Sequence, residues 1–187
     1  MAGAPRTLIL LAVLAPFASS AQNRGPTTAA ALDKLFAELK AAPTEQDAAP
    51  IEAQIQGLWV QAGSPSARLL ISRGLRELSA GANKDAIDDF GAALTLDPDL
   101  TEGYYRRAAA RYAAGDTAGA LHDLADTLKR EPRHFDALRL LSNIAEARGD
   151  WRAAYGAWQR LLEIDPKARG GEQHFQYLQR RAYGQPT

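Results

Sequence analysis

Hydrophobic and polar positions along the chain recur in blocks of thirty-four residues, each holding two amphipathic helical stretches. In block 101–134, the stretches Thr101–Ala114 and Ala118–Glu131 carry apolar side chains at helical spacing. Gly115 lies between them, where a helix end favours a left-handed residue, and Pro132 follows because proline cannot continue a helix. The pattern therefore predicts one helix–turn–helix hairpin for each block.

The same period brings other landmark residues into register. Prolines, glycines, alanines and large apolar residues fall in shared columns: Pro98, Pro132 and Pro166; Gly81, Gly115 and Gly149; Ala86, Ala120 and Ala154; Phe90, Leu124 and Trp158. Small alanines let two helices cross closely, and the large residues one turn later predict contacts with the next hairpin. Three repeats follow from this register, at 67–100, 101–134 and 135–168.

Helical stretches flank the three repeats on both sides. Residues 29–66 contain two apolar stripes at helical spacing and are interpreted as a degenerate first repeat or a cap. A shorter stripe at 171–183 predicts a helix that covers the last hairpin, as terminal elements of repeat arrays do. The predicted helical domain spans 29–183 and follows a linker at 22–28.

The N-terminal segment has a different pattern from the rest of the chain. Leu8–Ala18 is an apolar run that follows one arginine, Arg6, and precedes the small residues of Ser19–Gln22. This order is typical of a secretory signal peptide, here at 1–21, and the run is shorter than the roughly 20 residues that span a bilayer. A buried N-terminal helix is the alternative. We expect export, to a bacterial periplasm or the medium, with no membrane anchor after cleavage.

Composition narrows the classes of function. The 187 residues include 22 Lys plus Arg and 22 Asp plus Glu, and the pI is about 6.8, so no broad basic surface for nucleic acid is expected. The chain has no cysteine, which excludes disulfides, thiolate catalysis and zinc sites built on sulfur. Hydrophobic residues make up 46% of the chain, enough to bury a core.

Motifs of catalytic and cofactor sites are absent from the sequence. It contains no nucleophile elbow, no phosphate-binding loop and no dinucleotide fingerprint. His122 and Asp126 stand four residues apart, a spacing that can hold a metal, but no third ligand is evident. Asp89 and Asp123 are interpreted as solvated charges on helix exteriors. We therefore expect no enzyme, no metal site and no cofactor.

The repeat resembles the tetratricopeptide repeat family, whose signature is a thirty-four-residue helix–turn–helix with glycine, alanine, a large residue and proline at fixed positions. The small residue of that signature at repeat position 8 is Gly74, Ala108 or Ser142 here. The resemblance implies an all-α fold, an α-solenoid of stacked hairpins with a degenerate N-terminal repeat and a C-terminal capping helix. With the N-terminal segment, it suggests an exported bacterial-type member.

The resemblance also implies a binding surface. In this family the first helix of each repeat lines a concave groove, through positions 2, 5, 9, 12 and 13. The groove residues carried over to this chain are Arg68, Ile71, Leu75, Leu78, Tyr105, Ala109, Tyr112, Arg139, Asn143 and Glu146, with Glu102 and Asp136 at position 2 of the later repeats. Tyr105 and Tyr112 either anchor a ligand or pack between repeats, and the sequence leaves both open.

These observations predict a non-catalytic scaffold of the cell envelope for protein–protein interactions. Its partner would be another protein, which places a peptide or helix in the groove, and nucleic acid is not expected as a partner. The alternative is a structural factor that self-associates within an envelope assembly. The sequence does not identify the partner, because one repeat scaffold serves many ligands.

Overall fold

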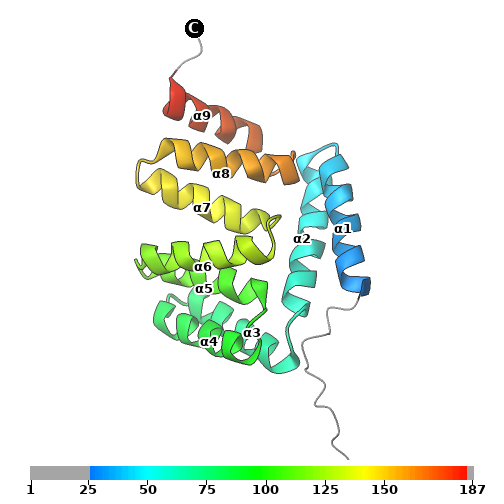
Figure 1. The fold of residues 1–187 in the computed structure, drawn as a ribbon, viewed down its shortest axis with the longest axis vertical. Helices are drawn as coiled ribbons and strands as arrows, with labels where there is room; N and C mark the ends of the chain where they lie inside the picture. Colours follow the sequence, from blue (N-terminus) through cyan, green and yellow to red (C-terminus); the bar gives the residue numbers. More distant parts are fainter. Residues whose placement is uncertain (1–25, 185–187) are drawn as a thin grey trace, which may run out of the picture.

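The computed structural model describes residues 26–184, and the regular secondary structure within them is entirely α-helical (Figure 1). The helices are α1 (Pro26–Ala41), α2 (Glu45–Gln61), α3 (Pro65–Ser79), α4 (Asn83–Leu96), α5 (Thr101–Ala113), α6 (Thr117–Arg130), α7 (Phe135–Ala147), α8 (Trp151–Ile164) and α9 (Gly171–Tyr183). The predicted α-solenoid is therefore confirmed. The signal peptide predicted at 1–21 lies outside the described residues, and the end of the predicted linker coincides with the start of α1.

Three hairpins, α3–α4, α5–α6 and α7–α8, form the repeat stack, in which α4 packs on α5 and α6 on α7. The turns inside these hairpins are set by Gly81, Gly115 and Gly149, whose φ angles are 77°, 85° and 73°. Residues other than glycine rarely adopt this left-handed backbone conformation, so these three glycines end the first helix of each hairpin. Asp116 and Asp150 then cap the second helices by accepting backbone N–H groups.

The alanine and large-residue columns form the core of the stack. Ala86, Ala120 and Ala154 are fully buried, as are Phe90 and Leu124 to within 1%. Repeat position 8 requires a small residue for steric reasons. A Cβ on Gly74, for example, would lie 2.7 Å from the ring of Phe90. The alanine column is therefore buried in each hairpin, as the repeat period predicted. Beyond the last hairpin, α9 packs on α8.

The N-terminal hairpin α1–α2 does not continue the stack. In Figure 1 it runs along one side of the stack at a steep angle to the other helices, and it packs on α5 and α8 and contacts α7 through side chains. Residues 29–66 thus form the two helices expected of a degenerate repeat, but within the described residues neither helix packs extensively on α3 or α4. Leu69 on α3, which is 69% exposed, lies at the end of the stack that this arrangement leaves uncovered.

Bulky apolar side chains explain this placement. The buried face of α1–α2 carries Phe36, Leu39, Ile55 and Trp59, which join one core cluster with residues of α7, α8 and α9. The second apolar stripe of residues 29–66 begins at Ile51, but α2 begins six residues earlier, because the side chain of Thr44 accepts the N–H of Asp47 and caps the helix there.

Among residues 26–184, no helix has both the length and the hydropathy that crossing a membrane requires.

Candidate functional site: the inner face of the repeat stack

The first helices of the three hairpins, α3, α5 and α7, carry the surface that the resemblance implies for ligand binding, and we call it the inner face. The hairpin α1–α2 divides it into two parts. The covered half lies under α2 and includes Tyr105, Asp136 and Arg139, at positions 2 and 5 of the repeat. The open half consists of Leu75, Leu78, Ala109, Tyr112 and Asn143, at positions 9 and 12.

An aromatic contact joins α2 to the covered half. The Trp59 ring stacks on the imidazole of His134, with ring centroids 4.1 Å apart and an interplanar angle of 10°, and it also meets Phe135 at 5.2 Å. Tyr105 approaches the same imidazole, at 4.7 Å. Tyr105 therefore lies beneath the chain's own hairpin, where it packs against the end of the repeat and is largely shielded from solvent.

His134 is fully buried and anchors a polar network under Trp59. Its Nδ1 accepts the N–H of Ala137 at 3.2 Å, which leaves the ring proton on Nε2 to donate to Glu102 Oε2 at 3.2 Å. Glu102 also accepts Arg106 Nε at 2.6 Å. Although burial opposes its ionisation, the hydrogen bond from His134 and the charge of Arg106 hold the pKa of Glu102 below its usual range. The network fixes the start of α7, where His134 is the N-cap, to the start of α5.

A second polar cluster lies where α2 meets α7 and the end of α8. Gln56 Nε2 donates to Asp136 Oδ2 at 2.7 Å, and Glu52 faces Asp165, whose side chain is buried. Burial, reinforced by the hydrogen bond and charge of Asp165, raises the pKa of Glu52 to about 7, and the nearby Arg139 only partly opposes this. Burial raises the pKa of Asp165 as well. The two carboxyl groups therefore favour a shared proton.

This carboxyl pair predicts that the docking of α2 weakens as the pH rises. The pKa of Glu52 is higher in the docked state than its ordinary value of 4.5, so the docked chain binds more protons and loses that advantage as pH rises through about 7. We expect protection factors of α2 amides in hydrogen exchange to be about three- to tenfold greater at pH 5 than at pH 8.

The substitution Glu52→Gln should remove most of this dependence, because an amide donates to Asp165 without titrating. Glu38→Gln, on the exposed face of α1, serves as the matched control and should leave it intact. A wild-type chain with the same protection at both pH values would contradict the shared proton.

The other predicted groove residues have different environments. Leu75, Leu78, Ala109 and Tyr112 are half-buried and Asn143 is exposed. Arg68 is exposed, whereas Ile71 is only 1% exposed and belongs to the core of the first hairpin, so it is not available to a partner. Glu146, near the end of α7, is half-buried and its carboxylate lies 2.8 Å from His174 Nε2 of α9.

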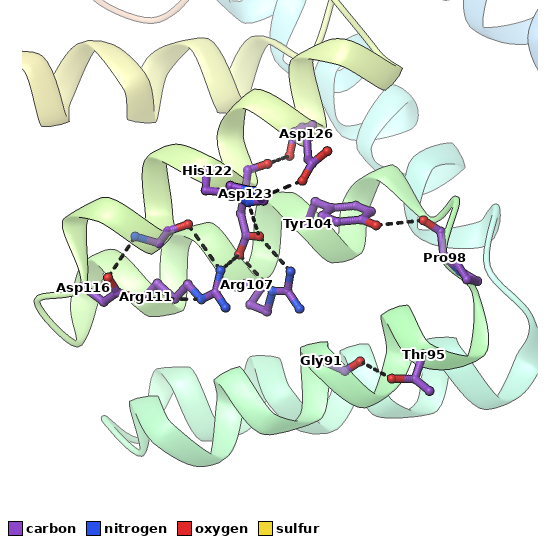
Figure 2. A network of polar contacts seen from close by, with 12 residues as sticks. Gly91, Thr95, Pro98, Tyr104, Arg107, Arg111, Asp116, His122, Asp123 and Asp126 are labelled. Carbon is purple, nitrogen blue, oxygen red and sulfur yellow. Dashed lines mark hydrogen bonds and ion pairs between the residues drawn. The ribbon is translucent and has the colours of Figure 1, made fainter.

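Buried ion pairs between the two helices of a hairpin were missed by the sequence analysis. Asp123 accepts Arg107 Nε at 2.9 Å, Arg107 Nη2 at 2.8 Å and Arg111 Nη1 at 2.7 Å (Figure 2). Asp89 pairs in the same way with Arg73, one repeat earlier. The interpretation of Asp89 and Asp123 as solvated charges is therefore wrong, because they are only 4% and 0% exposed.

A signal for these pairs was present in the sequence. Arginine at position 7 and aspartate at position 23 recur together in the first two repeats, as Arg73 with Asp89 and Arg107 with Asp123. The third repeat has Leu141 and Ala157 at these positions. Charge and countercharge thus change together, as expected of residues that face each other across a hairpin.

The structure supplies, in Asp123, the third potential metal ligand near His122 and Asp126 that was not evident from the sequence. Ligand atoms of His122, Asp123 and Asp126 lie within 4.8 Å of one another, and Figure 2 shows them on α6. Both oxygens of Asp123, however, already accept hydrogen bonds from two arginines. A cation would have to displace these guanidinium groups, so the cluster is accounted for by the ion-pair network.

Comparison with known proteins places the fold in context. The chain is 30% identical over 156 residues to a TPR repeat-containing protein of Rhizobium etli, a match that covers 83% of this chain and 76% of that protein. No sequence profile of a known protein family matches it.

The fold is found in solved structures, including two with a bound peptide. The first TPR domain of Spaghetti (RPAP3), bound to an HSP90 peptide, superposes with a TM-score of 0.58 at 20% identity, covering 63% of this chain and 93% of that one. The Yersinia enterocolitica type III secretion chaperone SycD, in complex with a peptide of the translocator YopD, gives 0.55 at 16% identity, covering 65% and 92%.

Proposed function

Because the chain belongs to the tetratricopeptide repeat family, we propose that it is a non-catalytic scaffold that binds a peptide or helix of a partner protein on its inner face. A preformed surface on rigid stacked hairpins loses little entropy when an extended ligand binds. The RPAP3 and SycD structures, each with a peptide bound, support this proposal for a shared fold.

The observation that carries the proposal is the composition of the open half. Leu75 and Leu78 from α3 lie in series with Ala109 and Tyr112 from α5, followed by the exposed amide of Asn143 on α7. No hydrogen bond involves the Tyr112 hydroxyl within residues 26–184, so the hydroxyl is available to a ligand. Apolar and aromatic side chains supply affinity at such surfaces, and polar groups at one end fix direction.

We further propose that this scaffold works outside the cytoplasm. The apolar run Leu8–Ala18, followed by small residues, supports export. Self-association is the second candidate function, and an exposed apolar side chain at the uncovered end of the stack favours it. Leu69 on α3 is 69% exposed there.

One experiment separates the two candidates. We expect the double variant Leu78→Ala, Tyr112→Ala to capture the native partner from an extract of its own cells at least about tenfold less well than the wild type, because it removes the aromatic side chain and one of the two leucines of the open half. Quantitative mass spectrometry of the captured protein measures this, and circular dichroism checks that helicity is unchanged.

Leu69→Ala is the matched control, since it removes an equally large apolar side chain outside the inner face. It should leave partner capture unaltered. If Leu69→Ala lost binding while the double variant bound fully, the interaction surface would be the end of the stack and not the inner face. That result would favour self-association.

A further inference from the structure

The hairpin α1–α2 occupies the inner face as a bound helix would. The helix α2 places Trp59 on His134, Gln56 on Asp136 and Glu52 toward Asp165. Asp136 is at position 2 of its repeat, and His134 contacts Tyr105 at position 5 of the preceding repeat. Asp165 lies within electrostatic reach of Arg139, also at position 5. Positions 2 and 5 are among those from which the resemblance derives ligand contacts. Part of the surface proposed for a partner is thus filled by a segment of the chain itself.

Building on the proposed function, we propose that α1–α2 is an internal ligand, and that the partner carries an amphipathic helix that replaces α2 on the covered half. The partner would then contact the open half and, after displacement of α2, the covered half as well. Only chains with an undocked hairpin could bind on the covered half, so the apparent affinity for the partner would be the intrinsic affinity multiplied by the undocked fraction. The docked hairpin would therefore lower the affinity.

Unsatisfied polar atoms at this interface support replacement. Trp59 Nε1 and Arg139 Nη2 are buried without a hydrogen-bond partner among the described residues, and Asp165 Oδ2 lacks one unless Glu52 carries the shared proton. Only two further side-chain atoms in that range share this condition, so the unsatisfied groups concentrate where α2 meets the stack. Buried polar groups without partners destabilise the docked state, and a ligand that supplied the missing partners would have an advantage over α2.

The connection of the hairpin to the stack also suits displacement. The helix α2 ends at Gln61 and α3 begins at Pro65, with Ser64 as its N-cap. Within the described residues the hairpin packs extensively on neither helix that follows this link, α3 or α4. Its displacement would therefore break the contacts with α5 and α8 and the shared core cluster, while the first repeat, α3–α4, would keep its packing.

The contacts of α2 define the chemistry of the partner helix. The imidazole of His134 requires a flat aromatic side chain in place of Trp59. The site that the fully buried Ile55 occupies, four residues earlier, requires an aliphatic side chain. Asp136 accepts an amide, as it does from Gln56. Asp165 requires a hydrogen-bond donor at the position of Glu52, so a glutamine or lysine would serve better than a carboxylate. The partner helix is therefore expected to carry a hydrogen-bond donor, then an aliphatic residue three positions later, an amide residue directly after it, and an aromatic residue three positions further. This is the spacing of positions 52, 55, 56 and 59.

A labelled peptide with the sequence of residues 45–61 provides a direct probe. We expect it to bind the full chain carrying Trp59→Ala at least about tenfold more tightly than the wild-type chain, because loss of the indole undocks the internal helix and frees its place. Fluorescence anisotropy measures the affinity. The same peptide with alanine in place of its tryptophan should bind neither chain.

A locked chain supplies the opposite control. Asp33 on α1 and Arg133 form an exposed ion pair across the interface, with 2.7 Å between Oδ1 and Nη1. The chain has no cysteine of its own, so Asp33→Cys with Arg133→Cys can be joined selectively by a short bis-maleimide. The cross-linked chain should not bind the peptide. Should Trp59→Ala fail to fold, Gln56→Ala, which removes only one polar contact, tests the same gain on a smaller scale.

The outcomes discriminate the inference from the proposed function. Equal peptide affinity in the locked, wild-type and opened chains would overturn the internal ligand, as would a folded Trp59→Ala chain that gains nothing. In either case, partner capture that still depends on Leu78 and Tyr112 would leave the scaffold function intact. Capture that is indifferent to those two residues would instead remove the function on which the inference rests.

Discussion

Replacing Trp158 by alanine should lower the free energy of unfolding by roughly 3–5 kcal/mol, as truncation of a buried aromatic side chain does. The indole is 5% exposed and belongs to the core cluster shared by α7, α8 and α9. Its Nε1 donates to the carbonyl oxygen of Gly171 at 2.9 Å, so the same side chain holds the start of α9. Its loss leaves a cavity and an unpaired carbonyl at the end of the stack.

Urea denaturation followed by circular dichroism measures this effect, and Trp158→Phe separates its two components. Phenylalanine keeps most of the packing but removes the hydrogen-bond donor, so its cost should be about 1 kcal/mol. A Trp158→Ala variant with an unchanged unfolding midpoint would show that α9 is not held by this contact. Since domains of this size are stable by about 5–15 kcal/mol, the predicted loss is a large share of the total.

The period of thirty-four residues predicted what depends on local sequence and on neighbouring repeats. The glycines at 81, 115 and 149 end helices because only they tolerate the backbone conformation found there. The alanine column had to be small because helices cross at it, and the structure buries it completely. Each of these features is decided by residues within one repeat or the next, so a repeating pattern reveals them.

The position of α1–α2 could not be predicted in this way. Its apolar stripes predict helices and a buried face, but a stripe does not state which surface covers it. Trp59 meets His134, seventy-five residues later in the chain, and that choice depends on the assembled shape of the stack. A degenerate repeat that continues the stack and a hairpin that crosses it require the same amphipathic pattern.

The candidate site was predicted only in outline for the same reason. Tyr105 and Arg139 were placed on the inner face by family position, yet the structure puts them beneath α2. Glu102 was placed on the inner face by its repeat position, which cannot show that it is hydrogen-bonded to His134 in a buried network. Charged residues are where local reasoning failed most, because a buried and a solvated aspartate have the same neighbours in sequence.

Removing the carboxylate of Asp123 should be nearly as damaging as removing the indole of Trp158. Asp123→Ala leaves Arg107 and Arg111 beside a space that their countercharge had filled, with side chains only 19% and 25% exposed. Breaking a fully buried pair costs roughly 3–5 kcal/mol, and partial access of the guanidinium groups to water reduces this to roughly 2–4 kcal/mol. Thermal and urea unfolding of the variant provide the measurement.

The third repeat indicates how the loss can be reversed. It carries Leu141 and Ala157 where the second carries Arg107 and Asp123, so an apolar pair fits the same crossing of two helices. We therefore expect Arg107→Leu with Asp123→Ala to recover at least about half of the stability lost by Asp123→Ala alone, since no unpaired charge faces the gap from α5. Arg111 retains Asp116, 3.8 Å away, and the carbonyl of Gly119.

Asp89→Ala is the matched control at the same position of the first repeat. Its partner Arg73 is 55% exposed and can turn to solvent when the carboxylate is lost, so the destabilisation should be smaller than that of Asp123→Ala. Equal losses at the two positions would contradict an explanation by burial of the arginines. A double variant less stable than Asp123→Ala would show that the repeats are not interchangeable at this crossing, because the leucine of the third repeat would then depend on neighbours that the second repeat lacks.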